Sequence, residues 1–344
     1  MKKLRFILLL GICAIVLSSC NISFIKGSTS IPHGSATYTE STSEYTLPDS
    51  NNPNGYKITF DLGDGETYTT TTTTSGNVLM PSNPEKNFAF FEGWYLNDNL
   101  FNFDTQVNSE LTLKAKWSYD VESLVNHIYR NTIKACIKVE TILSKNGFIT
   151  RSTTDSIGSG IIISEQNGYY YALTNNHVIY CDYSKYDSAE YIVYDAFNNE
   201  YASNKVSLLY HNANYDLALI RFRKSDKDLA VVELAKTSVT DNVFALGNPK
   251  SLANTISFGS YLGTQTFTPK AEQVNESNVT FDVICHSAFI DNGSSGGGLL
   301  NYNLKLIGIN FASRVTVDTE QFTKAFAIPV EKINEFIAEY NNRN

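Results

Sequence analysis

The chain contains few cysteines, and this scarcity limits the classes of fold that it can adopt. Only 5 of its 344 residues are cysteine. Cys136, Cys181 and Cys285 lie in the body of the chain, and an odd number at such wide spacing is not a disulfide framework. No Cys-x-x-Cys pair or His/Cys group suggests a metal site, so we expect three buried apolar thiols and neither a metal nor a cofactor. The alternative is a single disulfide among them, since an extracytoplasmic compartment would permit one.

Positive charge is also scarce. The chain has 27 Lys and Arg against 35 Asp and Glu, a formal net charge of −8, and no basic patch. These features argue against nucleic-acid binding. Hydrophobic residues make up 42% of the chain, and its 21 Tyr and 20 Phe, with many Thr, Val and Ile, favour strands over helices. The length allows two domains.

The N-terminal segment is typical of a signal sequence. Basic residues precede an apolar run from Phe6 to Leu17, which is too short for a membrane-spanning helix. The run ends in Leu17-Ser18-Ser19-Cys20, which resembles a bacterial lipoprotein lipobox. This resemblance implies a signal peptide at 1–19 and a diacylated Cys20 that anchors the chain outside the cytoplasm, at the bacterial cell membrane. The alternative is an ordinary cleaved signal and a secreted protein.

Two segments follow before the main domain. Residues 20–55 are rich in Ser, Thr, Gly, Asn and Pro, which predicts a flexible tether. Residues 56–117 have an all-β pattern, because Tyr56–Phe60 alternates and is followed by the turn-forming Asp61–Gly65. The threonine-rich run from Tyr68 to Ser75 also suits a strand, since its residues are β-branched.

Residues 56–117 resemble the internalin-type B-repeat of bacterial surface proteins. The resemblance lies in the segments "ITFDLGDG", "MPSNPEKNFAFFEGWY" and "LTLKAKW", in this order. It implies a small β-grasp-like domain that serves as a spacer or an adhesive unit. We expect a spacer that lifts the following domain off the membrane.

Residues 118–344 form the main domain. Val121, Leu124, Val125 and Ile128 are spaced as on one helix face, with Asp120 as a possible N-cap. Many short β-like runs follow, among them Ile133–Val139, Gly160–Ser164, Tyr169–Thr174, Tyr191–Tyr194, Asp216–Arg223, Val243–Leu246, Val279–Ile284 and Lys305–Ile309. They predict an all-β barrel or sandwich. A helix is expected over Val330–Tyr340, after the last of these strands.

A glycine-rich loop, Gly293-Ser294-Ser295-Gly296-Gly297-Gly298, suits a nucleophilic serine. The Gly-x-Ser-Gly-Gly register selects Ser295, and the N–H groups of Gly293 and Ser295 are the candidate oxyanion donors. Upstream, His177 follows an apolar strand and Asp216 opens another. A histidine such as His177 would be the base that takes the serine proton, and a carboxylate such as that of Asp216 would fix the histidine tautomer. We expect His33, His127 and His211 to be surface residues.

The main domain resembles the HtrA/DegP-like branch of the trypsin-like serine proteases. The resemblance rests on "GSGIII", "ALTNNHVI", "YDLALIRF", "FALGNP", "NGSSGGGLLN", "LIGIN" and "FAIPVEKINEFI", in the family's order. It implies a chymotrypsin-like fold of two six-stranded β-barrels with the site between them. By this resemblance His177 is the general base, Asp216 orients it and Ser295 is the nucleophile.

The sequence departs from the family pattern at Ser294, where Asn or Asp is usual, and at Gly298, where proline is usual. We expect a freer loop but a working site, and no following PDZ domain. The segments 286–290 and 310–313 should line the primary pocket, with His286 as a structural polar residue. No acidic residue marks a pocket floor, which favours a small or medium apolar P1 side chain.

Together these features predict a membrane-anchored, extracytoplasmic serine endopeptidase that acts on proteins or peptides. The alternative is a surface adhesin or binding protein whose protease-like domain is a silent scaffold. The oligomeric state stays open.

Overall fold

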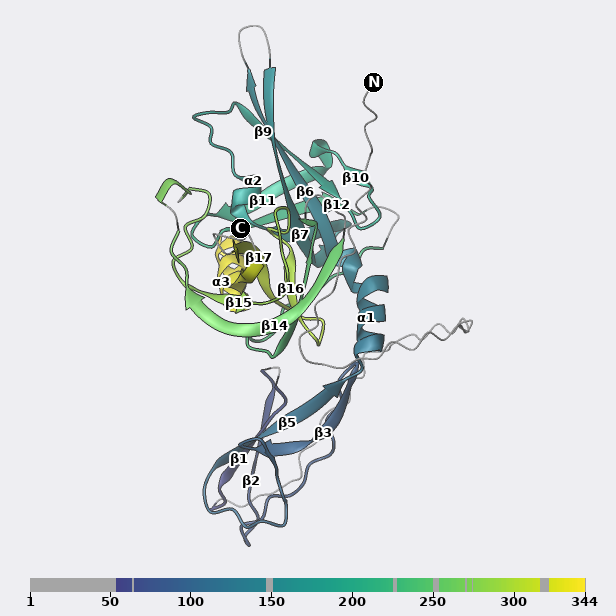
Figure 1. Cartoon of the computed structure of the whole chain (residues 1–344), viewed down its shortest axis with the longest axis vertical. Coiled ribbons are helices and arrows are strands. Elements are labelled where there is room, and N and C mark those ends of the chain that lie inside the picture. Colours follow the sequence, from purple (N-terminus) through teal and green to yellow (C-terminus); the bar gives the residue numbers. More distant parts are fainter. Residues whose placement is uncertain are drawn as a thin grey trace, which may run out of the picture. The chain divides into compact units, whose positions relative to one another are not determined.

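The computed structural model describes residues 54–63, 65–146, 151–224, 228–249, 254–269, 271–273, 275–315 and 322–343. The expected signal peptide, Cys20 and most of the expected tether lie outside these ranges. Within them, no helix has the length and apolar character needed to cross a membrane. Strands dominate the described residues (Figure 1).

The segment at 56–117 folds as one mixed five-stranded sheet. Its spatial order is β2-β1-β5-β3-β4, with strands β1 Lys57–Asp61, β2 Thr67–Thr71, β3 Ala89–Leu96, β4 Asn99–Leu100 and β5 Leu111–Tyr119. The threonine-rich run forms β2, as its β-branched residues predict. The first and last long strands, β1 and β5, are parallel neighbours. Ile58, Phe60, Trp94 and Leu113 fill its small core.

A helix joins this sheet to the main domain. Helix α1, Val121–Arg130, begins where the sequence predicts, and the Asp120 side chain accepts a hydrogen bond from the N–H of Ser123. The predicted strand at Ile133 starts later than expected, because Thr132–Ala135 forms a 3-10 helix before β6 begins at Cys136.

The first half of the main domain is a seven-stranded antiparallel sheet of order β10-β9-β6-β7-β8-β12-β11. Its elements are β6 Cys136–Asn146, β7 Arg151–Gln166, β8 Tyr169–Thr174, α2 Asn176–Ile179, β9 Ser188–Tyr194, β10 Glu200–Tyr201, η2 Ser203–Lys205, β11 Val206–Asn212 and β12 Leu217–Arg223. No ladder between edge strands β10 and β11 closes this sheet in the described residues. Strand β10 is only two residues long, and the 3-10 helix η2 then interrupts the extended backbone.

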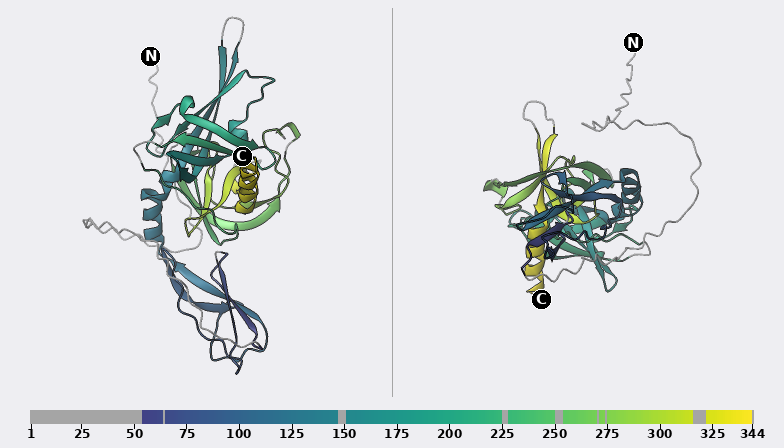
Figure 2. Two further views of the ribbon diagram at one scale, coloured as in Figure 1. Left: turned by 180° about the vertical axis from the view of Figure 1, so that it is seen from behind. Right: turned by 90° about the horizontal axis from the view of Figure 1, so that it is seen from below.

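The second half is a closed barrel of six strands, β13-β14-β15-β18-β17-β16. Its elements are β13 Asn242–Gly247, β14 Thr255–Thr266, η4 Ala271–Gln273, β15 Asp282–His286, β16 Gly298–Asn301, β17 Leu306–Val315 and β18 Phe322–Pro329. The all-β, chymotrypsin-like class is therefore confirmed, with one closed barrel and one half-barrel instead of two closed barrels. Figure 2 shows the curved barrel strands from two further directions.

The C-terminal helix α3, Val330–Asn341, confirms the predicted amphipathic segment and packs against both halves of the main domain. The ring of Phe336 stacks on Tyr210 of β11, with ring centroids 5.0 Å apart. The Glu339 carboxylate accepts hydrogen bonds from the hydroxyls of Tyr210, at 2.8 Å, and Tyr215, at 2.9 Å. One apolar core runs through both halves and includes Phe336. The helix thus fastens the two halves together next to Asp216.

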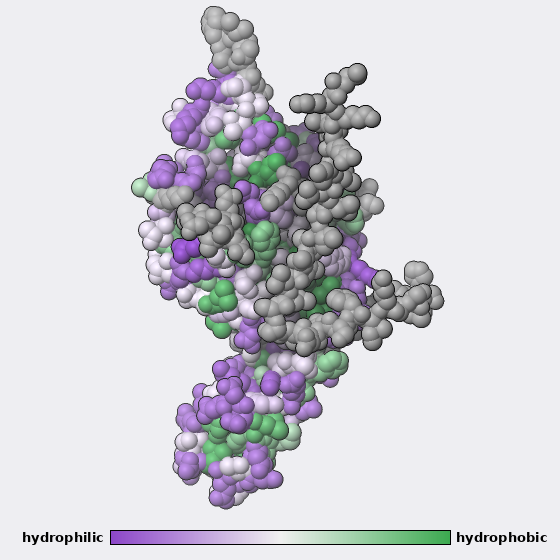
Figure 3. Space-filling model, in the orientation of Figure 1, coloured by the Kyte–Doolittle hydropathy of each residue, from purple (hydrophilic) through white to green (hydrophobic). Residues whose placement is uncertain are grey.

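The three cysteines of the main domain are buried and free, as expected. Burial raises the pKa of the Cys136 thiol to about 12, so this thiol stays protonated at neutral pH. The face shown in Figure 3 is largely hydrophilic, with scattered apolar areas over both the N-terminal sheet and the main domain. The N-terminal sheet exposes Leu79, Met80, Phe90 and Leu100.

Candidate active site

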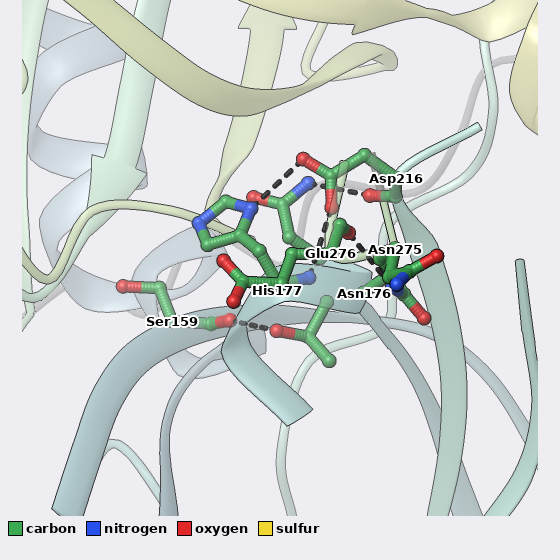
Figure 4. Close-up of polar contacts among 8 residues, drawn as sticks. Ser159, Asn176, His177, Asp216, Asn275 and Glu276 are labelled. Carbon is green, nitrogen blue, oxygen red and sulfur yellow. Dashed lines mark hydrogen bonds and ion pairs between the residues drawn. The ribbon is translucent and has the colours of Figure 1, made fainter. Parts of the chain in front are cut away.

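His177 and Asp216 are joined by two hydrogen bonds. The Nδ1 atom of His177 lies 2.8 Å from Oδ2 of Asp216, and the His177 backbone N–H donates to Oδ1 at 3.0 Å (Figure 4). Asp216 is fully buried, whereas 28% of the His177 side chain is exposed. A carboxylate only accepts hydrogen bonds, so Nδ1 carries the ring proton and Nε2 keeps its lone pair. This tautomer is the one that a general base needs.

Two opposing influences act on the His177 pKa. Burial disfavours the charged imidazolium and lowers the pKa, while the charge and hydrogen bond of Asp216 and the charge of Glu276 raise it. The net result is a raised pKa, because the nearby carboxylates outweigh the loss of water.

Local structure refines both sequence expectations. His177 follows strand β8, as expected, but lies within the short helix α2. Asp216 precedes β12 instead of opening it, and its backbone has φ of +50°, in the left-handed region. Such a backbone is uncommon for a non-glycine residue. The side chain of Asn175 donates to the Asp216 carbonyl at 2.8 Å, and the Asp216 N–H donates to Ala213 at 3.1 Å. These contacts hold the strained turn.

The two adjacent serines of the glycine-rich loop have different surroundings. Ser294 is only 3% exposed, and its Oγ accepts from the N–H of Asp291 at 3.3 Å. Ser295 is more exposed. The turn between them and β16 requires Gly296, which has φ of +87° and where a Cβ would lie 2.1 Å from the Ser159 carbonyl.

The loop leaves two backbone donors available. Among the residues that the structure describes, neither the N–H of Gly293 nor that of Ser295 has a hydrogen-bond acceptor. Gly293 has φ of +95°, which a glycine adopts without strain. Two free N–H groups on one tight loop are the hydrogen-bond donors that an oxyanion hole requires.

Ser159 of β7 holds this loop from the other half of the domain. Its N–H donates to the Ser295 carbonyl at 2.7 Å, and its Oγ donates to the Gly293 carbonyl at 2.7 Å. The same Oγ accepts from the backbone N–H of Asn248 at 2.8 Å. Ser159 and Asn248 are both buried. The Ser159 hydroxyl thus fixes the peptide that follows Gly293, the first candidate oxyanion donor.

Ser295 lies close to the helix that carries His177. A Cβ at Gly158 would lie 2.9 Å from the Ser295 carbonyl and 2.6 Å from Val178, the residue after His177. In the described ranges, however, no hydrogen bond joins Ser295 Oγ to His177. Catalytic hydrogen bonds are often loose without substrate and tighten only in the complex.

A cavity of about 390 Å³ opens beside the histidine. His177 and Asp216 line one side, and the β14–β15 loop and the β17 segment Phe311–Arg314 line the others. The expected wall at 310–313 is therefore mostly present, but none of residues 286–290 lines this cavity. The segment around Ala288 packs on β14 instead, where a Cβ at Gly259 would meet the Ala288 nitrogen at 2.1 Å.

The other histidines have structural surroundings. His286 is buried, its Nε2 lies 3.0 Å from Oδ1 of Asn310, and burial lowers its pKa to about 4, as suits a structural polar residue. His211 is exposed, as expected, and lies on β11, with Nδ1 2.7 Å from Oδ1 of Asn176. His127 packs against Phe88 on α1. His33 lies outside the described residues, among which no three His, Cys, Asp or Glu side chains gather as a metal site requires.

Sequence reasoning assigned no role to Ser159, Asn248 or Glu276. The polar Ser159 between two glycines at the start of an apolar run was the available signal for the first. Asn248 stands in the "FALGNP" segment, but nothing local shows that its side chain turns toward β7. Glu276 lies in a polar loop and carries no signal in the sequence.

Two family models match the chain. The trypsin-like peptidase domain matches residues 158–309, and the Listeria-Bacteroides repeat domain matches residues 56–116. The first match contains His177, Asp216 and Ser295, and the second coincides with the five-stranded sheet.

Curated relatives are serine proteases of the HtrA family. The chain is 29% identical over 187 residues to a probable periplasmic serine endoprotease DegP-like of Buchnera aphidicola, which covers 54% of this chain and 36% of the relative. It is 33% identical over 191 residues to rat serine protease HTR4, covering 55% and 35%. It is 32% identical over 200 residues to serine protease HTRA1 of Xenopus tropicalis, covering 57% and 38%. The matched region thus spans little more than a third of each relative.

Proposed function

We propose that the main domain is a serine endopeptidase in which Ser295 is the nucleophile, His177 the general base and Asp216 its orienting carboxylate. The single observation that carries this proposal is the 2.8 Å contact between His177 Nδ1 and a fully buried Asp216. This His177–Asp216 pair also lies beside the Gly293–Gly297 loop, which carries Ser295. The homologous HtrA-family serine proteases support the same conclusion.

The chemistry follows from the roles of these groups. Nε2 of His177 takes the Ser295 proton as Oγ attacks the scissile carbonyl, and Asp216 stabilises the imidazolium that forms. The N–H groups of Gly293 and Ser295 hold the tetrahedral oxyanion. His177 then returns the proton to the leaving amine, which produces an acyl-enzyme that water hydrolyses.

An extended peptide has a docking edge in this arrangement. Strand β16 pairs with β17 only up to Ile309, and backbone bonds of the nucleophile loop continue to Asn310. Beyond this point β17 pairs only with β18 in the described residues. The free edge at Phe311–Arg314 faces the cavity and can accept a substrate strand by β-augmentation.

Labelling with a fluorophosphonate probe tests the nucleophile. The full chain should form a covalent adduct, Ser294→Ala should still form it, and Ser295→Ala should not. Labelling that survives Ser295→Ala would overturn the assignment. A peptide library, with Ser295→Ala as the control, then shows whether labelling reflects turnover.

The alternative function is a surface adhesin or binding protein with a silent protease-like scaffold. The observation that favours it is the missing hydrogen bond between Ser295 Oγ and His177. Turnover decides between the two, because a scaffold would give the same peptide signal with Ser295→Ala as with the unchanged chain.

We also propose that the chain is anchored outside the cytoplasm by a lipid on Cys20, with the repeat at 56–117 as a spacer. The lipobox-like Leu17–Cys20 segment supports the anchor, and the periplasmic description of one relative supports the location. Metabolic labelling with a fatty acid should mark the chain and not its Cys20→Ala variant. Equal labelling of both would point to another site, and no labelling to a secreted protein.

A further inference from the structure

We infer that Glu276 forms an anionic subsite beside His177 and that the protein prefers substrates with Lys or Arg at P2, the residue before the one whose bond is cut. This inference rests on the proposed endopeptidase function and adds a substrate class to it. The subsite belongs to the cavity that His177, Glu276 and the free edge of β17 line together.

The Glu276 side chain is half-buried and lies beside the His177 imidazole (Figure 4). In the described part of the chain no cation lies within ion-pair distance of its carboxylate. Its negative charge nevertheless reaches its neighbours, since it helps to raise the pKa of His177, Tyr180 and Lys185. A half-buried carboxylate without a cation in a substrate cavity is suited to a cationic side chain of the ligand.

The backbone at Glu276 is held in place without a ligand. The side chain of Asn176, the neighbour of His177, donates to the Glu276 carbonyl at 2.7 Å. Two residues later, Asn278 donates its backbone N–H to Ala213 and its side chain to Asn214, both at 2.8 Å. The loop is thereby fastened to the helix that carries the base and to the turn before Asp216, which limits the ordering cost of binding.

Chain geometry selects P2. A substrate strand on β17 places the P1 carbonyl at Ser295, and its side chains alternate between the two sides of the strand. P1 and the residue before it therefore point to opposite sides of the strand, and the cavity wall that contains His177 and Glu276 is the side that the P2 side chain would meet.

The other charged groups around the cavity leave this preference in place. Lys185 is already paired with Asp182 at 3.0 Å. Arg314 is on the β17 wall, and its guanidinium lies over the ring of Phe326, 5.9 Å from the centroid. Asp216 is fully buried and committed to His177. Glu276 is thus the carboxylate that a P2 cation meets.

The test uses the full chain and peptide libraries in which P2 is fixed as Lys, Arg, Gln or Glu and every other position is an equimolar mixture. The unchanged protein should cleave the P2-Lys and P2-Arg libraries about tenfold faster than the P2-Gln library, the size expected of one charged hydrogen bond. Glu276→Gln should bring this ratio near unity, and Glu276→Lys should favour P2-Glu. Glu272→Gln changes an exposed carboxylate of the same loop and should keep the original ratio.

The ratio between libraries separates specificity from any general effect on His177, because both libraries report on the same base. Raising the ionic strength should reduce the preference. Equal cleavage of the P2-Lys and P2-Gln libraries by the unchanged protein overturns the inference and leaves the endopeptidase function intact. A preference that persists in Glu276→Gln overturns it as well. Absence of both library cleavage and probe labelling in the unchanged protein overturns the endopeptidase function and the subsite with it.

Discussion

The two halves of the main domain hold the proposed catalytic groups by different means. The half-barrel holds the base through side chains, because both oxygens of Asp216 accept hydrogen bonds from His177. The closed barrel presents the nucleophile loop through backbone turns, with positive φ at Gly293 and Gly296. The base is therefore preset within its own half, whereas the loop depends on a partner.

That partner belongs to the opposite half. Ser159 on β7 bonds to the carbonyls of both Gly293 and Ser295, and Asn248 of the closed barrel bonds to Ser159 in return. The comparison teaches that the geometry of the proposed oxyanion hole depends on the interface between the halves. Substitutions at the His177–Asp216 pair and at the Ser159 contact should consequently lower the turnover number by different amounts.

The largest effect is expected from Asp216→Asn. An amide would offer an N–H toward Nδ1 and stabilise the tautomer with its proton on Nε2, which cannot act as a base. The turnover number should fall by about 10⁴-fold, as removal of the orienting carboxylate does in triads of this kind. Peptide hydrolysis measures this loss, and Asp228→Asn, at a carboxylate whose side chain is 92% exposed, is the matched control. A loss of less than tenfold would remove Asp216 from the triad.

Ser159→Ala should have the next largest effect. Without the hydroxyl the Gly293 carbonyl loses its donor and the Asn248 N–H loses its acceptor, so the loop is freed while the base is untouched. We expect the turnover number to fall about tenfold to a hundredfold, less than for loss of an oxyanion donor itself, with little change in KM.

The exposed Ser152 on the same strand provides the control, as Ser152→Ala. A purely structural role for Ser159 would lower the thermal stability and leave the turnover number of the folded fraction unchanged. The Ser159→Thr variant keeps the hydroxyl and should restore part of the lost rate. A rise in KM alone would show that Ser159 serves substrate binding and not the oxyanion loop.

The sequence predicted what depends on local pattern. The helix at Val121, the C-terminal helix and the all-β class follow from periodicity, and the triad candidates follow from motif order. It missed what depends on contacts between distant segments. The Ser159 hydroxyl bonds to the carbonyl of Gly293, which lies 134 positions further along the chain. The left-handed backbone of Asp216 is held by a hydrogen bond from the side chain of Asn175, which lies in a different turn.

The pH dependence of kcat/KM tests the role of His177 as the base. The base works only when neutral, so kcat/KM should rise as the pH increases through the pKa of His177, which lies above its ordinary value. Glu276 contributes to this upward shift. Glu276→Gln should therefore move the acidic limb of the profile to lower pH and increase the relative activity in mildly acidic buffer. The P2-Gln library gives the cleanest profile, because it lacks a P2 charge. An acidic limb that moves to higher pH would contradict the role of this charge.

Ser294→Ala should have the smallest effect, and it is the sharpest test of how the loop divides its work. The Ser294 hydroxyl is buried and makes one long contact, 3.3 Å from the Asp291 nitrogen. Its loss should lower the free energy of unfolding by about 1 kcal/mol, the size of one ordinary hydrogen bond. Probe labelling should stay close to that of the unchanged chain, because Ser295 and both free N–H groups remain. If labelling instead disappeared while thermal unfolding changed little, the nucleophile would be Ser294. The buried face of the loop, and not its exposed face, would then carry the chemistry.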